Sequence, residues 1–281
     1  MFGCIPALIV LADGTVPPLT LLFSRSVVAV LLLGLSVLIL RKRAPLPMPR
    51  RRRTALLGFL LGLVVLGPDT VVYYLSFALI DTSVAVAISY VYPTLVVLGL
   101  AAYQRTRPSR PDLLLGLWAL AGVALLTLPG SGASVSMAGA ALALITAAGY
   151  ALYVLLAGRL SMDMGPLRMA LWVTAGSAVA AIAPAVVREG AAVPAGTQAW
   201  LVVVGQAVLF MAALGCYYAG LRRLGAARAS LLDTAQPLVA VVAGAWILGE
   251  RLFPLQLLGV LIIVSSVAGA AALALGRANP P

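Results

Sequence analysis

Long apolar runs separated by short polar turns occupy nearly the whole chain of 281 residues. A helix crosses the hydrocarbon core of a bilayer, about 30 Å thick, with about 20 residues at 1.5 Å per residue. Nine of the runs approach or exceed this length, so the pattern predicts helices that span a bilayer. The nine predicted spans are 18–40, 54–79, 83–103, 113–128, 137–157, 167–187, 199–221, 227–248 and 255–275.

A tenth run, residues 2–12, is too short and reaches only about half of the bilayer core. The polar and proline residues after it are typical of a helix end and a turn, and the run lacks the basic start of a signal peptide. Matching Pro18 to Pro166 aligns Met1 with Gly149, inside a longer predicted helix. We therefore expect a first helix that is truncated by a misassigned start, and proteomic mapping of the N-terminus tests this expectation.

The chain repeats a pattern at a spacing of 144 positions. The tyrosine pair at 73–74 matches the pair at 217–218, and Pro93 matches Pro237. With the short first run the chain has ten predicted helices, five in each half, and an odd number per half gives the halves opposite orientations. Such inverted repeats recur in secondary transporters, where the substrate site lies near the membrane midplane between the repeats. We assign residues 1–128 to the first five-helix repeat and 129–281 to the second.

Composition supports an all-α polytopic membrane protein. The chain is 63% hydrophobic and 10% charged, whereas a soluble domain is about 45–50% apolar and about 25% charged. The formal net charge of +11 favours an acidic partner at first sight, but the charges fall in short clusters between apolar runs. That placement is typical of membrane orientation, so we expect no nucleic-acid partner.

The loops predict the orientation. If the N-terminus is cytoplasmic, sixteen of the nineteen basic residues fall in inside loops, which the positive-inside rule favours. The proline-rich basic segment 41–53 is then a cytoplasmic topology anchor, with binding of anionic lipid as the alternative. One lysine against eighteen arginines indicates a GC-rich bacterial coding bias. We expect a multi-pass protein of the bacterial inner membrane with both termini in the cytoplasm.

Several of these stretches resemble the EamA family of the drug/metabolite transporter superfamily. The most specific are residues 17–33, with an arginine in the second helix, and residues 229–267, with a proline inside the ninth helix and a Gly-Glu-Arg that closes it; 84–100 and 113–126 also match. The resemblance implies ten helices in two inverted repeats and a secondary transporter, often an exporter of amino acids or other small metabolites. The sequence departs from the family at 104–106, where Gln-Arg-Thr replaces the usual Gly-Glu.

Two ionisable residues inside apolar runs are candidate functional groups, because a charge there needs a partner or a wet cavity. Asp69 follows Gly67 and Pro68, which loosen the helix, and it is a candidate proton carrier. Arg25 is a candidate for recognising a substrate carboxylate, since a guanidinium matches that group. The structural alternatives are a buried pair between Asp69 and Arg25, a backbone partner for Asp69, or an Arg25 that extends to the outer interface.

The second half supplies a third acidic candidate and a pair of prolines. Asp233 is a candidate gate at the inner mouth, with an interfacial carboxylate satisfied by Arg222, Arg223 or Thr234 as the alternative. Pro93 and Pro237 remove a helical hydrogen bond at matching places, so we expect hinges of alternating access or static bends that shape the cavity.

Polar-tipped residues inside the runs complete the predicted substrate cavity. Tyr73 and Tyr217 match across the repeats, and Gln206 shares a helix face with Tyr217 because the two are eleven positions apart. Tyr90 is a deep tyrosine of the fourth helix. Interfacial or packing roles are the alternative for each of them. The predicted cavity thus comprises Arg25, Asp69, Tyr73, Tyr90, Gln206, Tyr217 and Asp233.

The sequence offers no enzymatic chemistry. Histidine is absent, the two cysteines have no metal or redox spacing, and no catalytic motif is present, so we expect no metal, no cofactor and no enzyme. The prediction is a monomeric or homodimeric transporter that exports a small, amino-acid-like metabolite by alternating access, with protons as the candidate coupling ion. A phosphorylated solute is disfavoured because Arg25 is the only basic residue available to it. An uncoupled facilitator and a lipid-translocating protein remain alternatives.

Overall fold

Helices make up every secondary-structure element of the computed structural model within its described residues, 16–43, 52–77, 79–80, 82–127, 136–190, 193–239 and 254–278. Six helices in these ranges are long and apolar enough to cross a membrane, which confirms the prediction of an all-α polytopic membrane protein. The short run 2–12 and the end of the ninth span, with its Gly-Glu-Arg, lie outside the described residues. The elements are α2 (Pro18–Arg43), α3 (Arg52–Leu60), η2 (Leu61–Leu66), α4 (Gly67–Ser76), α5 (Thr82–Ser89), α6 (Tyr92–Gln104), α7 (Arg110–Thr127), α8 (Met137–Met164), α9 (Pro166–Glu189), α10 (Gly196–Leu224), α11 (Ala226–Asp233) and α13 (Pro254–Ala278).

These helices pack into two compact units. Unit 1 comprises Met1–Val71 and Leu156–Arg222, and unit 2 comprises Val72–Leu155 and Arg223–Pro281. Each unit therefore draws helices from both halves of the sequence, and the compact units divide the chain differently from the predicted repeats.

In unit 1 the third predicted span contains a π-helical turn, η2, between α3 and α4. Its cause is Pro68, which has no backbone N–H to donate to the carbonyl four residues earlier. The backbone widens there, and the N–H of Gly67 donates to the carbonyl of Gly62, five residues back. The loosened helix that the Gly-Pro pair predicts is therefore confirmed.

The backbone of helix α9 lies very close to the backbone of this span, with glycine at the points of contact. A Cβ added at Gly62 would overlap the Val173 carbonyl, and one added at Gly176 would overlap the Phe59 carbonyl. Small residues let helix backbones approach closely, and close approach stabilises helix pairs in a membrane. The glycines on both sides of this contact therefore fix α9 against α3 and η2.

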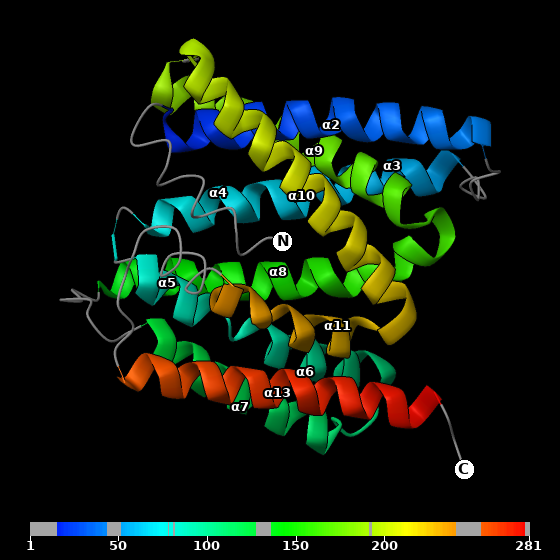
Figure 1. The fold of residues 1–281 in the computed structure, drawn as a ribbon, viewed down its shortest axis with the longest axis vertical. Coiled ribbons are helices and arrows are strands. Elements are labelled where there is room, and N and C mark those ends of the chain that lie inside the picture. The colour runs from blue at the N-terminus through cyan, green and yellow to red at the C-terminus, as the bar shows by residue number, and fades with distance from the viewer. Residues whose placement is uncertain are drawn as a thin grey trace. The chain divides into compact units, whose positions relative to one another are not determined.

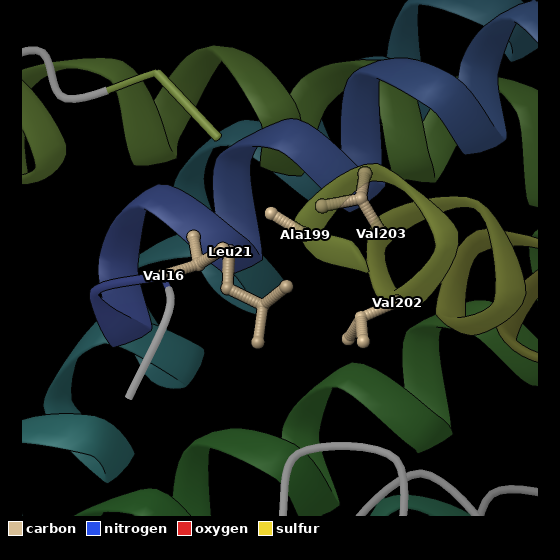
Figure 2. Packing of buried hydrophobic residues seen from close by; sticks show 5 residues of the cluster. All are labelled: Val16, Leu21, Ala199, Val202 and Val203. Atoms are coloured by element: carbon tan, nitrogen blue, oxygen red, sulfur yellow. The ribbon is translucent and has the colours of Figure 1, made fainter. Parts of the chain in front are cut away.

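The start of α2 packs on α10 in the same unit. Figure 2 shows Val16 and Leu21 on one side of this contact and Ala199, Val202 and Val203 of α10 on the other, all of them buried. Helix α2 also lies along α9 (Figure 1). The helix that carries Arg25 is thus held by two neighbouring helices.

The carboxylate of Glu189 ties the end of α9 to the start of α2. It accepts hydrogen bonds from the backbone N–H groups of Leu19, at 3.0 Å, and Thr20, at 2.7 Å, and from the Thr20 hydroxyl at 2.8 Å. A helix leaves its first N–H groups without intrahelical partners, and a negative charge at that end is favourable. The contact joins the last residue of α9 to the second and third residues of α2, so these helices run antiparallel.

Replacing Glu189 with alanine is expected to destabilise the protein by about 1–2 kcal/mol, the usual effect of losing a helix N-cap. Thermal unfolding of the purified protein in detergent measures the loss. Val187→Ala is the matched control, because Val187 lies in the same last turn and is 82% exposed. Equal stability of the two variants would contradict a capping role for Glu189.

In unit 2, α13 packs along α7, and α11 packs against α6, α7 and α13 (Figure 1). The Ser266 hydroxyl donates to the Leu115 carbonyl at 2.9 Å, and the Trp118 indole donates to the Ser265 hydroxyl at 2.9 Å. A Cβ on Gly122 would lie 2.8 Å from the Ile262 side chain. Residue numbers thus fall along α13 as they rise along α7, and these two helices are also antiparallel.

Two spans in unit 2 are interrupted at matching positions. The fourth predicted span divides into α5 and α6 at Tyr90 and Val91, and the ninth divides at Thr234 after α11, with residues 235–239 helical again. Thr234 lies 144 positions after Tyr90, the spacing of the sequence repeat. Pro93 and Pro237 follow these breaks closely. A proline has no N–H to donate to the carbonyl four residues earlier, here Ser89 and Asp233, so each break begins where the helix lacks a hydrogen bond. That these prolines act as hinges of alternating access stays a prediction.

Candidate functional site

A small pocket of about 50 Å³ lies inside unit 1, beside the guanidinium of Arg25. The guanidinium carbon lies 4.7 Å from the centroid of the Phe210 ring, within the range of a cation–π contact. The pocket walls come from α2, from η2 and α4, from α9 and from α10. The lining residues are Leu22, Arg25, Ser26, Leu66, Gly67, Thr70, Ser177 and Phe210.

Arg25 is buried at 9% exposure. Its Nε has no hydrogen-bond partner among the described residues, and no ion pair joins Arg25 to Asp69 in that part of the chain. Neither the pairing with Asp69 nor an extension to the outer interface therefore describes this arginine. Asp69 itself is half-buried at the start of α4, next to the pocket residue Thr70.

Helix α10 contributes a buried polar row to the same unit. Gln206 lies one turn before Phe210 and is 1% exposed, and its amide nitrogen has no hydrogen-bond partner within the described residues. Tyr217 is buried three turns further along, in ring contact with Tyr218 at 6.3 Å. Both residues of the predicted common face, Gln206 and Tyr217, are thus buried.

In unit 2 the carboxylate of Asp233 is held by two neutral donors. The Tyr92 hydroxyl donates to Oδ2 at 2.6 Å, and the Gln236 side-chain amide donates to Oδ1. The Thr234 hydroxyl, one of the partners expected from sequence, donates instead to the Leu231 carbonyl. Asp233 is therefore bound across two spans, α11 and α6, next to both helix breaks.

Tyrosine rings extend from this carboxylate. The Tyr92 ring lies 5.9 Å from Tyr90 and 4.7 Å from Tyr150, and Tyr150 lies 5.5 Å from Tyr153, measured between centroids. Tyr90 packs on the buried Val123 and Ile263 of α7 and α13. The unit thus has an aromatic row with a carboxylate near one end.

The seven predicted cavity residues fall in both units. Arg25, Asp69, Gln206 and Tyr217 belong to unit 1, whereas Tyr73, Tyr90 and Asp233 belong to unit 2. Tyr73 packs on a separate buried cluster that includes Ile80 and Val84. That the seven line one cavity stays a prediction.

Several residues outside the predicted cavity set contribute to these sites. Tyr92 is the partner of Asp233, Phe210 covers Arg25, and Thr70 and Ser177 line the pocket. Local patterns offered two signals for them. Tyr92 directly precedes the repeated proline, and Phe210 lies four residues after Gln206 on the same helix face.

No group of three or more histidine, cysteine, aspartate or glutamate side chains suited to a metal ion occurs in the described ranges. The two sites offer one guanidinium, one hydrogen-bonded carboxylate, hydroxyls and aromatic rings. Such groups can form hydrogen bonds and ring contacts with a small polar solute.

Residues 137–272 match the model of the EamA-like transporter family. The chain is also 29% identical, over 195 residues, to a Salmonella typhimurium protein named "Uncharacterized inner membrane transporter YicL", and the match covers 66% of this chain and 63% of that relative. The chain thus matches less than two thirds of the length of the curated relative. These findings confirm the family resemblance and, with the apolar helices, support a multi-pass membrane protein.

A solved crystal structure of another protein has the same fold. The TM-score is 0.81 at 18% sequence identity, and the match covers 97% of this chain and 94% of that one. At this identity the likeness establishes the fold alone.

Proposed function

We propose that this chain, whose residues 137–272 match the EamA-like transporter family, is a secondary transporter that exports a small, amino-acid-like metabolite by alternating access. The observation that carries the proposal is the pair of interrupted spans in unit 2, one before Pro93 and one before Pro237. Interrupted helices at corresponding positions of two halves mark the substrate region of many secondary transporters. Asp233, with its partner Tyr92, lies beside both interruptions.

Helix directions within the units support the inverted repeats. By sequence, α2 corresponds to α9 and α7 corresponds to α13, and both pairs are antiparallel in the structure. Equivalent helices of two inverted repeats must run in opposite directions. We therefore retain 1–128 and 129–281 as the two five-helix repeats, with the short first run as the tenth helix.

The proposed setting is the bacterial inner membrane, with both termini in the cytoplasm and the chain acting as a monomer or a homodimer. Sixteen basic residues in the proposed inside loops support this orientation. The relative named an inner membrane transporter supports the location. Pro93 and Pro237 are the proposed hinges, because the backbone is already interrupted beside each of them.

Export is tested in cells that express the chain against cells with an empty vector. Mass spectrometry of amino acids and other small metabolites in the medium should reveal at least one solute enriched by expression and depleted inside the cells. An unchanged metabolite profile across the panel would contradict the exporter. Enrichment of lipid in the outer leaflet without any solute efflux would instead support lipid translocation.

Asp69 is the proposed site of proton coupling, because it is a half-buried carboxyl group that has no ion pair with Arg25. Asp69→Asn keeps the shape and removes the titration, so an imposed pH gradient should no longer drive solute flux while exchange at equal pH persists. Flux in proteoliposomes with and without the gradient measures the difference. Asp163→Asn, in the last turn of α8, is the control. Gradient-driven flux that survives Asp69→Asn would support an uncoupled facilitator or another coupling group.

A further inference from the structure

The strongest unexplained feature outside the interrupted spans is the pocket beside Arg25. An arginine side chain stays charged in proteins, and a buried charge without compensation is costly. Arg25 is nine-tenths buried and its Nε has no hydrogen-bond partner among the described residues. Phe210 covers the guanidinium through its ring but offers no negative charge. The group is therefore incompletely compensated, and the pocket lies next to it.

The other polar groups of the pocket are hydroxyls on three separate elements. Ser26 donates to the Leu22 carbonyl, Thr70 to the Leu66 carbonyl and Ser177 to the Thr174 carbonyl. None of these residues is acidic, so no element of the lining supplies a countercharge. A hydroxyl proton can rotate from its own helix carbonyl to a bound acceptor, so the hydroxyls can assist Arg25 in holding an anion.

The volume of the pocket and its single positive charge restrict which chemical group can bind there. Its volume of about 50 Å³ suits the head group of a solute and not a whole metabolite. A single guanidinium balances one negative charge and presents parallel N–H donors that match a carboxylate. A phosphate dianion would remain half compensated here.

We infer that the Arg25 pocket is a binding subsite for one carboxylate group, the carboxylate of the exported solute. The inference rests on the proposed transport function for the identity of the solute, but the binding chemistry is independent of transport. The rest of the solute lies outside the pocket.

Direct binding is tested on the purified full chain in detergent with acetate as the probe and acetamide as its uncharged isostere. Acetate should raise the thermal unfolding midpoint of the wild type in a saturable way, because a ligand of the folded state stabilises it. Acetamide should not raise it. Arg25→Gln should weaken the acetate response at least about tenfold, the effect of losing a hydrogen bond to a charged group. Comparing both proteins at the same salt concentration removes general salt effects.

The matched control is Arg228→Gln in unit 2, since Arg228 is also buried at 9% exposure but lies outside this pocket. It should retain the acetate response. If Arg25→Gln does not fold, Thr70→Val tests the same wall and should weaken acetate several-fold. An undiminished acetate response in Arg25→Gln, or in Thr70→Val where that variant replaces it, overturns the inference. A wild-type response to chloride that equals the acetate response also overturns it, in favour of an inorganic anion site.

Transport separates this inference from the proposed function. Acetate binding that depends on Arg25, without transport of any solute, would leave the subsite standing and defeat the transporter. Transport of a carboxylate solute that is unchanged in Arg25→Gln would defeat the subsite and leave the transporter standing.

Discussion

Replacing Gly176 with alanine is expected to cause a large loss of stability, about 3 kcal/mol or more. The added Cβ would overlap the Phe59 carbonyl and lie 2.6 Å from the backbone nitrogen of Leu63. Both atoms belong to helix backbone, which cannot rotate away as a side chain does. Helix α9 would have to move off α3 and η2, and the wall of the Arg25 pocket that Ser177 supplies would move with it.

Folded yield in detergent and the thermal unfolding midpoint measure this loss. Gly34→Ala on α2 is the control, because nothing lies within 4 Å of a Cβ at Gly34. Alanine is the better helix former by about 1 kcal/mol, so that variant should be as stable as the wild type or more so. Similar stabilities for the two variants would contradict the close contact of α9 with the third span.

Replacing Asp233 with alanine is the second large perturbation, with an expected loss of about 2–4 kcal/mol. The change removes the acceptor that the Tyr92 hydroxyl and the Gln236 amide share. A hydrogen bond to a charged group contributes about 1.5–3 kcal/mol, and the Ser230 carbonyl, 3.4 Å from the Tyr92 hydroxyl, offsets part of the loss. Transport should also fall sharply, since the contact joins the two interrupted spans. Thermal unfolding and solute flux measure the two effects.

A double-mutant cycle with Tyr92→Phe isolates the hydrogen bond. If the Tyr92 hydroxyl acts through Asp233, the double variant should be more stable than the sum of the single losses predicts, by about 0.5–3 kcal/mol. Asp233→Asn is the conservative control, because an amide oxygen still accepts from Tyr92. Additive losses in the cycle would rule out the Tyr92–Asp233 bond as the source of the effect.

The helices were predictable because the signal for a membrane span is length and composition, which any apolar run carries. The ends of the helices were less predictable. Helix α8 continues past the predicted end at 157 to Met164, and α10 continues past 221 to Leu224. Both stop where a glycine, Gly165 or Gly225, takes a φ near +80°. Each of these helices thus extends beyond its apolar run and ends at the glycine with a positive φ.

Sequence alone located the buried charges but not their partners. Arg25 and Asp233 stand out because an ionisable residue in an apolar run is unusual. Their contacts, Phe210 and Tyr92, come from spans far away in the sequence, and 141 positions separate Tyr92 from Asp233. Periodicity along one helix carries no information about which side chain a neighbouring helix presents.

The departure from the family pattern after the fourth span has a structural counterpart. Arg105 ends α6 with φ at 52°, a left-handed conformation that glycine adopts without steric cost. The matching position in the second half, 144 residues later, is Gly249, which lies outside the described residues. Arg105 thus takes a conformation that favours glycine although it is not a glycine.

Counterflow in proteoliposomes tests the central claim, carrier-mediated transport, most directly. Vesicles with the purified chain are loaded with each unlabelled solute of an amino-acid and metabolite panel and diluted into a trace of the same solute with a label. The account predicts that at least one carboxylate solute accumulates transiently above equilibrium, because a carrier that alternates between two faces exchanges labelled for unlabelled solute. No labelled accumulation for any solute, in vesicles that contain folded protein, would contradict it.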